Sequence, residues 1–152
     1  MDERVAKLKT PEDCEKFARN AIRLKRPDLA DEARKRAVEL RASKYGSTSD
    51  VERECLQAVY AYEEVLTRKN GRRTSASRTW QMIKRHGILA AVERAVNRES
   101  ETVGYTALVE MGLHEFAFEA VILRHPSLFS EEAVQRSKER LKEWTGIKKP
   151  DE

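Results

Sequence analysis

The sequence predicts an all-α protein that folds as a compact bundle of about seven to eight helices. Three observations lead to this fold class. Nearly every segment places apolar residues three and four positions apart, the spacing of one helical face. No segment shows the sustained alternation of apolar and polar residues that is typical of a half-buried strand. The chain has only six Gly and four Pro, so its helices should be joined by short connections.

The first predicted helix covers residues 11–24. Thr10 is its expected N-cap, and Pro11 suits the first helical position, where no backbone N–H is needed. Pro27 ends this helix, because the residue before a proline disfavours the α conformation.

Two longer helices follow in the N-terminal half. One is expected over residues 28–44, and its buried line is mostly alanine, which allows close approach of a neighbouring helix. The other is expected from Ser49 to Thr67. Ser49 and Glu52 have the spacing of a capping box, and the residues after them form a continuous apolar face.

The remaining helices are shorter, and glycines mark two of their ends. Gly87 should end one helix, and Gly112 should separate two others. A polar loop is expected from Arg98 to Thr102, and a frayed charged tail after Gly146. The predicted helical ranges are 75–85, 88–97, 104–111, 113–124 and 131–144.

Length and composition indicate one domain over residues 1–152, with possible subunits at 1–67 and 68–146 and no long linker between them. Cys14 and Cys55 occupy apolar helical positions and are expected to be buried thiols in a reducing cytoplasm. The charged N-terminus has no signal-peptide pattern, and the apolar stretches are too short for a membrane span. We therefore expect a cytoplasmic protein with no membrane association and no cofactor.

A basic segment at residues 68–87 is the main functional clue. It reads RKNGRRTSASRTWQMIKRHG and holds seven Lys or Arg but no Asp or Glu. Taking those seven from the chain's 30 basic residues leaves 23, against 26 acidic residues, so the rest of the protein is slightly acidic. A positive segment on such a body indicates a polyanionic partner.

On a helical wheel this segment has two sides. Ala76, Trp80 and Ile83 form an apolar stripe, and the opposite side carries Ser77, Arg78, Gln81, Lys84 and Arg85. The helix start holds Thr74, Ser75 and Ser77 beside Arg72 and Arg73. Free N–H groups and hydroxyls near arginines are suited to binding phosphate, and Arg and Gln can read base edges in a major groove.

The stretch TSASRTWQMIKRHG resembles the recognition helix of helix-turn-helix DNA-binding proteins. The resemblance covers residues 56–87 and implies that Ser75, Ser77, Arg78 and Gln81 contact bases. The chain departs from the family in the connection from Thr67 to Thr74, which is longer than the usual turn.

These observations predict a non-enzymatic protein that binds nucleic acid, with DNA favoured over RNA and duplex DNA as the main candidate. Lys69, Arg72 and Arg73 are expected to hold phosphates, and Ser75, Ser77, Arg78, Gln81 and Arg85 to face the groove. The full set of candidate contact residues is Arg68, Lys69, Arg72, Arg73, Thr74, Ser75, Ser77, Arg78, Gln81, Lys84 and Arg85.

Other interpretations remain open from the sequence. The basic segment could be an ordinary solvated face, or it could dock an acidic protein partner, with the alanine-rich face of residues 30–40 pairing with another helix. RNA binding would need Trp80 and Tyr45 exposed for stacking, whereas Trp80 at helical spacing is also typical of a core residue.

Catalytic and metal sites have little support in the sequence. No catalytic signature is present. Glu110 and His114 are four residues apart, with Glu115 and Glu119 nearby, but a metal site needs further convergent ligands. The carboxylates nearest the basic segment lack the spacing of a nuclease site: Glu63, Glu64, Glu93 and Glu99. We therefore predict no metal and no catalytic residues.

Overall fold

The computed structural model describes residues 1–46, 49–97 and 102–146, and the regular structure in these ranges is entirely helical, as predicted. Eight of its α-helices have at least seven residues. In chain order the elements are α1 (Glu3–Ala6), α2 (Pro11–Arg23), α3 (Pro27–Tyr45), α4 (Asp50–Asn70), α5 (Ser77–His86), α6 (Ile88–Asn97), α7 (Thr102–Glu110), the 3-10 turn η1 (His114–Phe116), α8 (Phe118–Arg124), the 3-10 turn η2 (Pro126–Leu128) and α9 (Glu131–Gly146).

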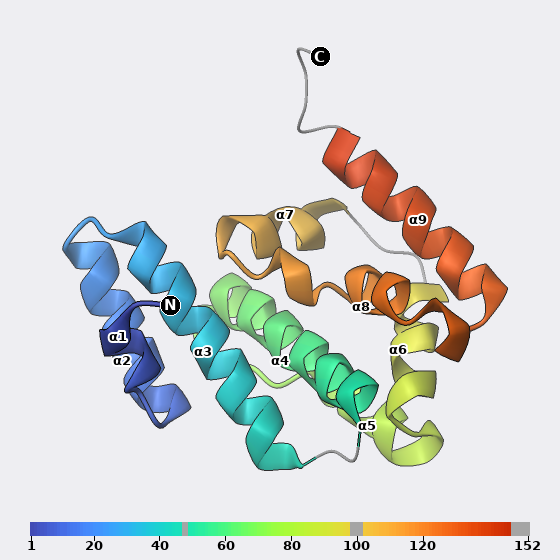
Figure 1. The fold of residues 1–152 in the computed structure, drawn as a ribbon, viewed down its shortest axis with the longest axis horizontal. Coiled ribbons are helices and arrows are strands. Elements are labelled where there is room, and N and C mark those ends of the chain that lie inside the picture. The colour runs from blue at the N-terminus through green and yellow to red at the C-terminus, as the bar shows by residue number, and fades with distance from the viewer. Residues whose placement is uncertain (47–48, 98–101, 147–152) are drawn as a thin grey trace.

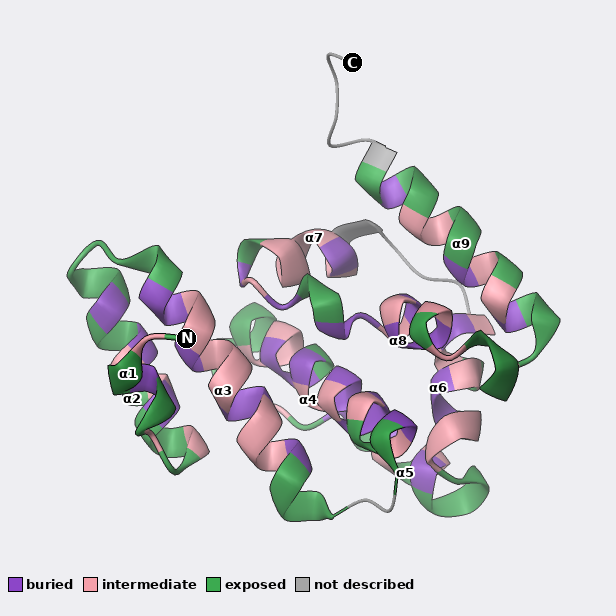
Figure 2. Cartoon of the chain, viewed as in Figure 1, coloured by how far each residue is buried: buried purple, intermediate pink, exposed green. Residues whose placement is uncertain are grey.

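Helix α4 lies at the centre of the molecule, and the other helices are arranged around it (Figure 1). It packs against α3 on one side and against α6, α7 and α8 on the other. Helices α1 and α2 pack on α3 at one end, and α9 packs on α8 and α6 at the other. Buried residues follow α4 along its length (Figure 2), with Leu56 and Val59 fully buried.

The pairing of α2 with α3 follows from the small residues on their facing sides. Ala18 and Ala21 of α2 are buried against Ala30 and Ala33 of α3. The predicted cap of α2 is also present, because the Thr10 hydroxyl accepts a hydrogen bond from the Asp13 N–H at 3.1 Å.

Helix α4 is longer than predicted. It starts with the expected Ser49 cap, whose hydroxyl accepts from the Glu52 N–H at 3.2 Å, but it continues past Thr67 to Asn70. Gly71 ends it with φ of 72°, and its N–H bonds to the Thr67 carbonyl. The chain leaves the helix only at this glycine, because glycine adopts the left-handed conformation without steric cost.

The predicted helix over residues 113–124 is wrong in its first part. Gly112 has φ of 70° and ends the preceding helix, as predicted. A short 3-10 turn and an extended Ala117 then follow before α8 begins at Phe118. Thr102 belongs to α7 rather than to a loop. The rest of the predicted loop, residues 98–101, and the predicted frayed tail, residues 147–152, lie outside the described residues.

Both cysteines are buried and unpaired. In the described ranges, every helix is too short or too polar to cross a bilayer.

Candidate nucleic-acid interface

Helix α5 carries the second half of the basic segment and buries the apolar stripe that the sequence predicts. Ala76, just before the helix, and Ile83 are buried, and both belong to a cluster with Val59 of α4 and Ala91 of α6. Gly87 ends the helix with φ of 93°, so that α6 folds back against α5. The apolar side therefore fixes α5 on α4 and α6.

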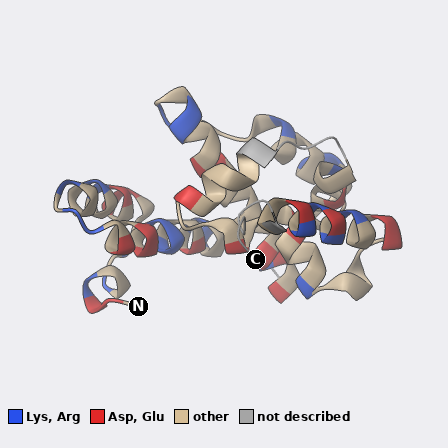
Figure 3. Cartoon of the chain, turned by 90° about the horizontal axis from the view of Figure 1, so that it is seen from above, with Lys and Arg blue, Asp and Glu red and all other residues tan. Residues whose placement is uncertain are grey.

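The opposite side of α5 faces solvent. All five polar residues assigned to it are exposed: Ser77, Arg78, Gln81, Lys84 and Arg85. Within the described residues, Arg78, Lys84 and Arg85 form no ion pair with a carboxylate. Elsewhere, acidic and basic residues occur together on most helices (Figure 3), and α9 is an example. The exposed side of α5 is thus a positive surface with no acidic residue of its own.

The start of α5 is held by Glu63, a buried residue of α4. One carboxylate oxygen, Oε2, accepts hydrogen bonds from the Ser75 hydroxyl at 3.0 Å, the Ala76 N–H at 2.8 Å and the Trp80 indole N–H at 2.6 Å. Of the backbone N–H groups near the helix start, Glu63 binds that of Ala76, which precedes the helix, and no side chain caps the helix itself. A carboxylate therefore lies next to the positive end of the helix dipole, where it competes with a phosphate.

Thr74 is also engaged within the protein. Its N–H donates to the Thr67 hydroxyl at 2.9 Å, and its own hydroxyl accepts from the Asn70 side chain at 3.1 Å. These bonds fix the connection between α4 and α5, and they turn Thr74 toward its neighbours rather than toward a ligand.

Trp80 is a packing residue on the inner edge of α5. Its ring stacks on Tyr45 with centroids 5.5 Å apart, and Tyr60 contacts it at 5.1 Å in a tilted arrangement. The side chain is half-buried, and its N–H is used by Glu63. Trp80 is therefore poorly placed to stack on a base, whereas Tyr45 is 48% exposed.

Arg73 lies in an ion-pair cluster that joins four parts of the chain. Its guanidinium contacts Glu64 of α4 at 2.5 Å and Glu15 of α2, and Arg41 of α3 contacts the same two carboxylates. Burial raises the pKa of Glu64, against the opposing effect of Arg73 and Arg41. The charge of Arg73 is therefore largely neutralised by Glu64 and Glu15 of the same protein.

Arg68 has an acidic partner as well. It pairs with Glu110 of α7 at 3.1 Å, with both side chains exposed. Such surface pairs are weak and can exchange for another anion, so Arg68 is held less firmly than Arg73.

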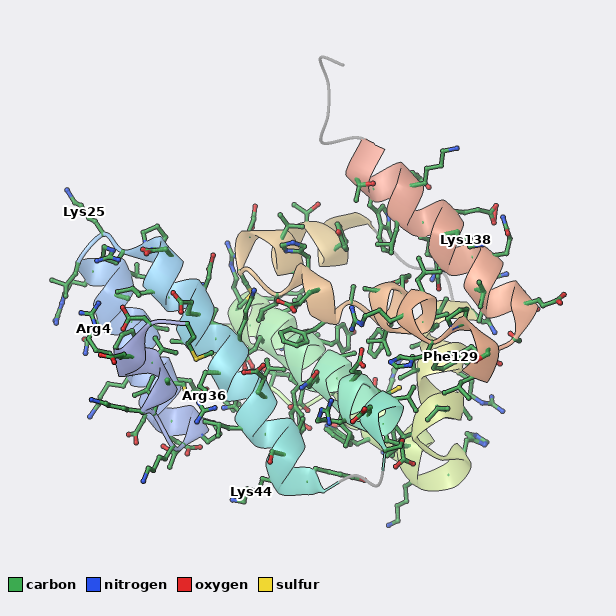
Figure 4. The ribbon with its side chains drawn as sticks, in the orientation of Figure 1. Arg4, Lys25, Arg36, Lys44, Phe129 and Lys138 are labelled. Carbon is green, nitrogen blue, oxygen red and sulfur yellow. The ribbon has the colours of Figure 1, made fainter. Side chains whose placement is uncertain are left out.

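The two other basic residues of the segment, Lys69 and Arg72, are exposed. A further cation comes from outside the segment. Tyr45 ends α3 against Trp80, which places the end of α3 beside α5, and Lys44 points outward there (Figure 4). Sequence reasoning missed Lys44 because only a contact distant in sequence relates it to α5.

The carboxylates considered for metal or catalytic chemistry have separate partners. Glu110 pairs with Arg68, Glu115 with Lys35 at 2.6 Å, and Glu119 with Arg140 at 3.3 Å. Glu93 accepts from the Ser130 N–H, and Glu99 lies outside the described residues. Where the structure describes the chain, no group of three His, Cys, Asp or Glu residues is arranged to hold a metal ion.

Comparison with known proteins identifies no relative of this chain. No protein-family model matches the sequence, and neither the curated proteins nor the solved structures include a significant match. The connection from Gly71 to Ala76 also exceeds the three- or four-residue turn of a helix-turn-helix motif. Function is therefore inferred from the geometry of α5 and of the exposed cations near it.

Proposed function

We propose that this protein binds nucleic acid, and duplex DNA in particular, by placing the exposed side of α5 in a major groove. The observation that carries the proposal is the positive side of a fixed surface helix, which has no acidic residue among its five polar side chains. A helix of 10 residues is about 15 Å long, and a major groove about 12 Å wide accepts one helix.

The geometry divides the candidate residues into two groups. Arg78, Gln81 and Arg85 lie on the outer side of α5, where their side chains can reach base edges. We assign the phosphate contacts to exposed cations on or near this helix: Lys44, Lys69, Arg72 and Lys84. Arg73, Thr74 and Ser75 are left out of the proposed contact set because of their internal partners.

The anchoring of α5 supports a binding role over an ordinary solvated face. Glu63 ties the start of the helix to α4, and Trp80 fixes it against Tyr45 and Tyr60. A surface helix held in this way presents its side chains with little loss of conformational entropy on binding.

The same positive surface could instead dock an acidic protein, and a competition experiment separates the two. We would measure binding of the full chain to a fluorescent DNA duplex, with single-stranded DNA, single-stranded RNA and heparin as competitors. The proposal expects duplex DNA to compete best and affinity to fall steeply with salt. Equal competition by heparin would favour the acidic-partner alternative, and a preference for RNA would reassign the nucleic acid.

A further inference from the structure

A second candidate site lies on the far side of α4 from the N-terminal helices. The structure contains a pocket of about 280 Å³ between α4, α7, α8 and α9, and Thr79 of α5 and Ala95 of α6 also line it. Tyr62, which lines it, is 38% exposed. Protein interiors hold few voids larger than a water molecule, and this pocket approaches the size range of small-molecule sites.

Aromatic rings form much of the pocket wall. Tyr105 stacks on Trp144 with centroids 5.2 Å apart, and Tyr62 contacts Phe118 at 6.1 Å. Aliphatic and small residues fill the spaces between the rings. An apolar cavity of about 150 Å³ holds a benzene molecule, so this pocket has room for a larger ring system.

One charged group lines this pocket, which also has the hydroxyl-bearing residues Tyr62, Thr79 and Tyr105 in its wall. Glu119, at the start of α8, is 5% exposed, and Arg140 of α9 contacts its Oε2 at 3.3 Å. Burial raises the pKa of this carboxylate, and Arg140 opposes the change. The carboxylate also has a backbone hydrogen bond within Glu119 itself. Two carboxylate oxygens offer about four acceptor positions, so Glu119 retains capacity to accept a further hydrogen bond.

We infer that the pocket binds a small, neutral aromatic molecule that donates one hydrogen bond to Glu119. The rings supply flat apolar contact, and the carboxylate supplies the charged hydrogen-bond acceptor that orients the ligand. A cationic ligand is disfavoured, because Arg140 already balances the charge of Glu119 and would repel a second cation. This inference is independent of the nucleic-acid proposal.

The two tryptophans of the chain allow a direct test, because Trp144 lines the pocket and Trp80 does not. Indole would be titrated into ¹⁵N-labelled protein while the two indole N–H signals are followed by NMR. The inference predicts a saturable shift of the Trp144 signal with the Trp80 signal unchanged. No shift at millimolar indole, or equal shifts of both signals, would overturn it.

Two comparisons test the ligand class and the location. Benzothiophene has the shape of indole without the N–H, and it should bind about tenfold more weakly through the loss of one charge-assisted hydrogen bond. Stronger binding of tetramethylammonium than of indole would overturn the neutral class. Ala95 lines the pocket and Ala90 does not, although both are half-buried residues of α6. Ala95→Leu should weaken indole binding at least tenfold and Ala90→Leu should leave it unchanged; equal effects would contradict the location.

Discussion

The carboxylate of Glu63 accepts a hydrogen bond from the indole N–H of Trp80 at 2.6 Å, and the same oxygen accepts from the Ala76 N–H at 2.8 Å. One buried side chain of α4 therefore holds both the start and the inner edge of α5. The proposed binding surface lies on the opposite side of this short helix, so its position depends on Glu63.

Replacing Glu63 should disturb the binding surface without removing any positive charge. We expect Glu63→Ala to lower the free energy of unfolding by about 1–3 kcal/mol, because the donors of Ala76 and Trp80 lose a buried acceptor. DNA affinity should fall as well. Urea unfolding and duplex titration measure the two effects. Glu110→Ala, at an exposed ion pair, is the control and should cost well under 1 kcal/mol; equal losses from both variants would contradict the role of Glu63.

Replacing the adjacent residues Arg72 and Arg73 should have different effects on stability and on DNA binding. Arg72→Ala should leave stability unchanged and reduce the salt dependence of DNA binding by about 0.9 in the log–log slope, the value for one lost phosphate contact. Arg73→Ala should cost about 1 kcal/mol of stability, since Arg73 is 41% exposed and Arg41 still pairs with Glu64. It should not change the salt slope. A reduced slope for Arg73→Ala with normal stability would return Arg73 to the contact set.

Two glycines should respond in opposite directions to alanine. A Cβ at Gly112 would lie 2.6 Å from the side chain of Asp31, and φ there is 70°. We expect Gly112→Ala to lower the free energy of unfolding by about 2 kcal/mol. Gly104 lies inside α7 with open space around it, so Gly104→Ala should raise stability by roughly 0.5–1 kcal/mol. Chemical denaturation of both variants gives the comparison, and destabilisation by Gly104→Ala would contradict the described geometry of α7.

Local patterns in the sequence predicted the helices but not the contacts between distant residues. The 3.6-residue period predicts α6 with its observed bounds, and caps such as Thr10 mark helix starts correctly. The two sides of α5 were also predicted, because amphipathic spacing is visible within one helix. The predicted helix over residues 113–124 was wrong in its first part because Ala117 adopts an extended conformation. An alanine within an apolar run gives no sign of such a conformation in the sequence.

The partners of individual charges could not be read from the chain. The sequence shows that the 68–87 segment is basic, but it does not show that Arg73 forms ion pairs with Glu15 and Glu64. The role of Glu63 was missed for the same reason, because a single carboxylate in a helix has no pattern that identifies its distant hydrogen-bond donors. Tertiary packing decides which cations remain available.

Acid should weaken the attachment of α8 to α4. Glu54 pairs with His125 at 2.8 Å and with Arg124 at 2.6 Å. Burial raises the pKa of Glu54, but these partners outweigh it and hold the pKa below the usual 4.5. A carboxyl group with a lowered folded-state pKa stabilises the fold above its unfolded pKa, and this contribution is lost as pH falls through the folded value.

The Glu54→Gln variant should therefore be less stable than the parent near neutral pH, and the difference should shrink below about pH 4.5. Thermal unfolding from pH 7 to pH 3 measures this dependence. Glu12→Gln, at an exposed position of α2, is the matched control and should follow the parent throughout. A difference that grows toward acid pH would contradict the assigned sign.

The proposed binding of duplex DNA by the exposed side of α5 can be tested by the salt dependence of binding in one variant. We would measure duplex affinity from 50 to 300 mM salt for the parent and for the triple variant Arg78→Ala, Lys84→Ala, Arg85→Ala. A variant with Lys16, Arg19 and Arg23 of α2 changed to Ala, which removes the same charge from another exposed helix, is the control. We predict that only the α5 variant loses affinity. Its slope should fall by about 0.9 for the phosphate contact of Lys84, because Arg78 and Arg85 are assigned to base edges. Equal slopes for the two variants would show that DNA binding depends on net charge rather than on α5, and would rule out α5 as the binding surface.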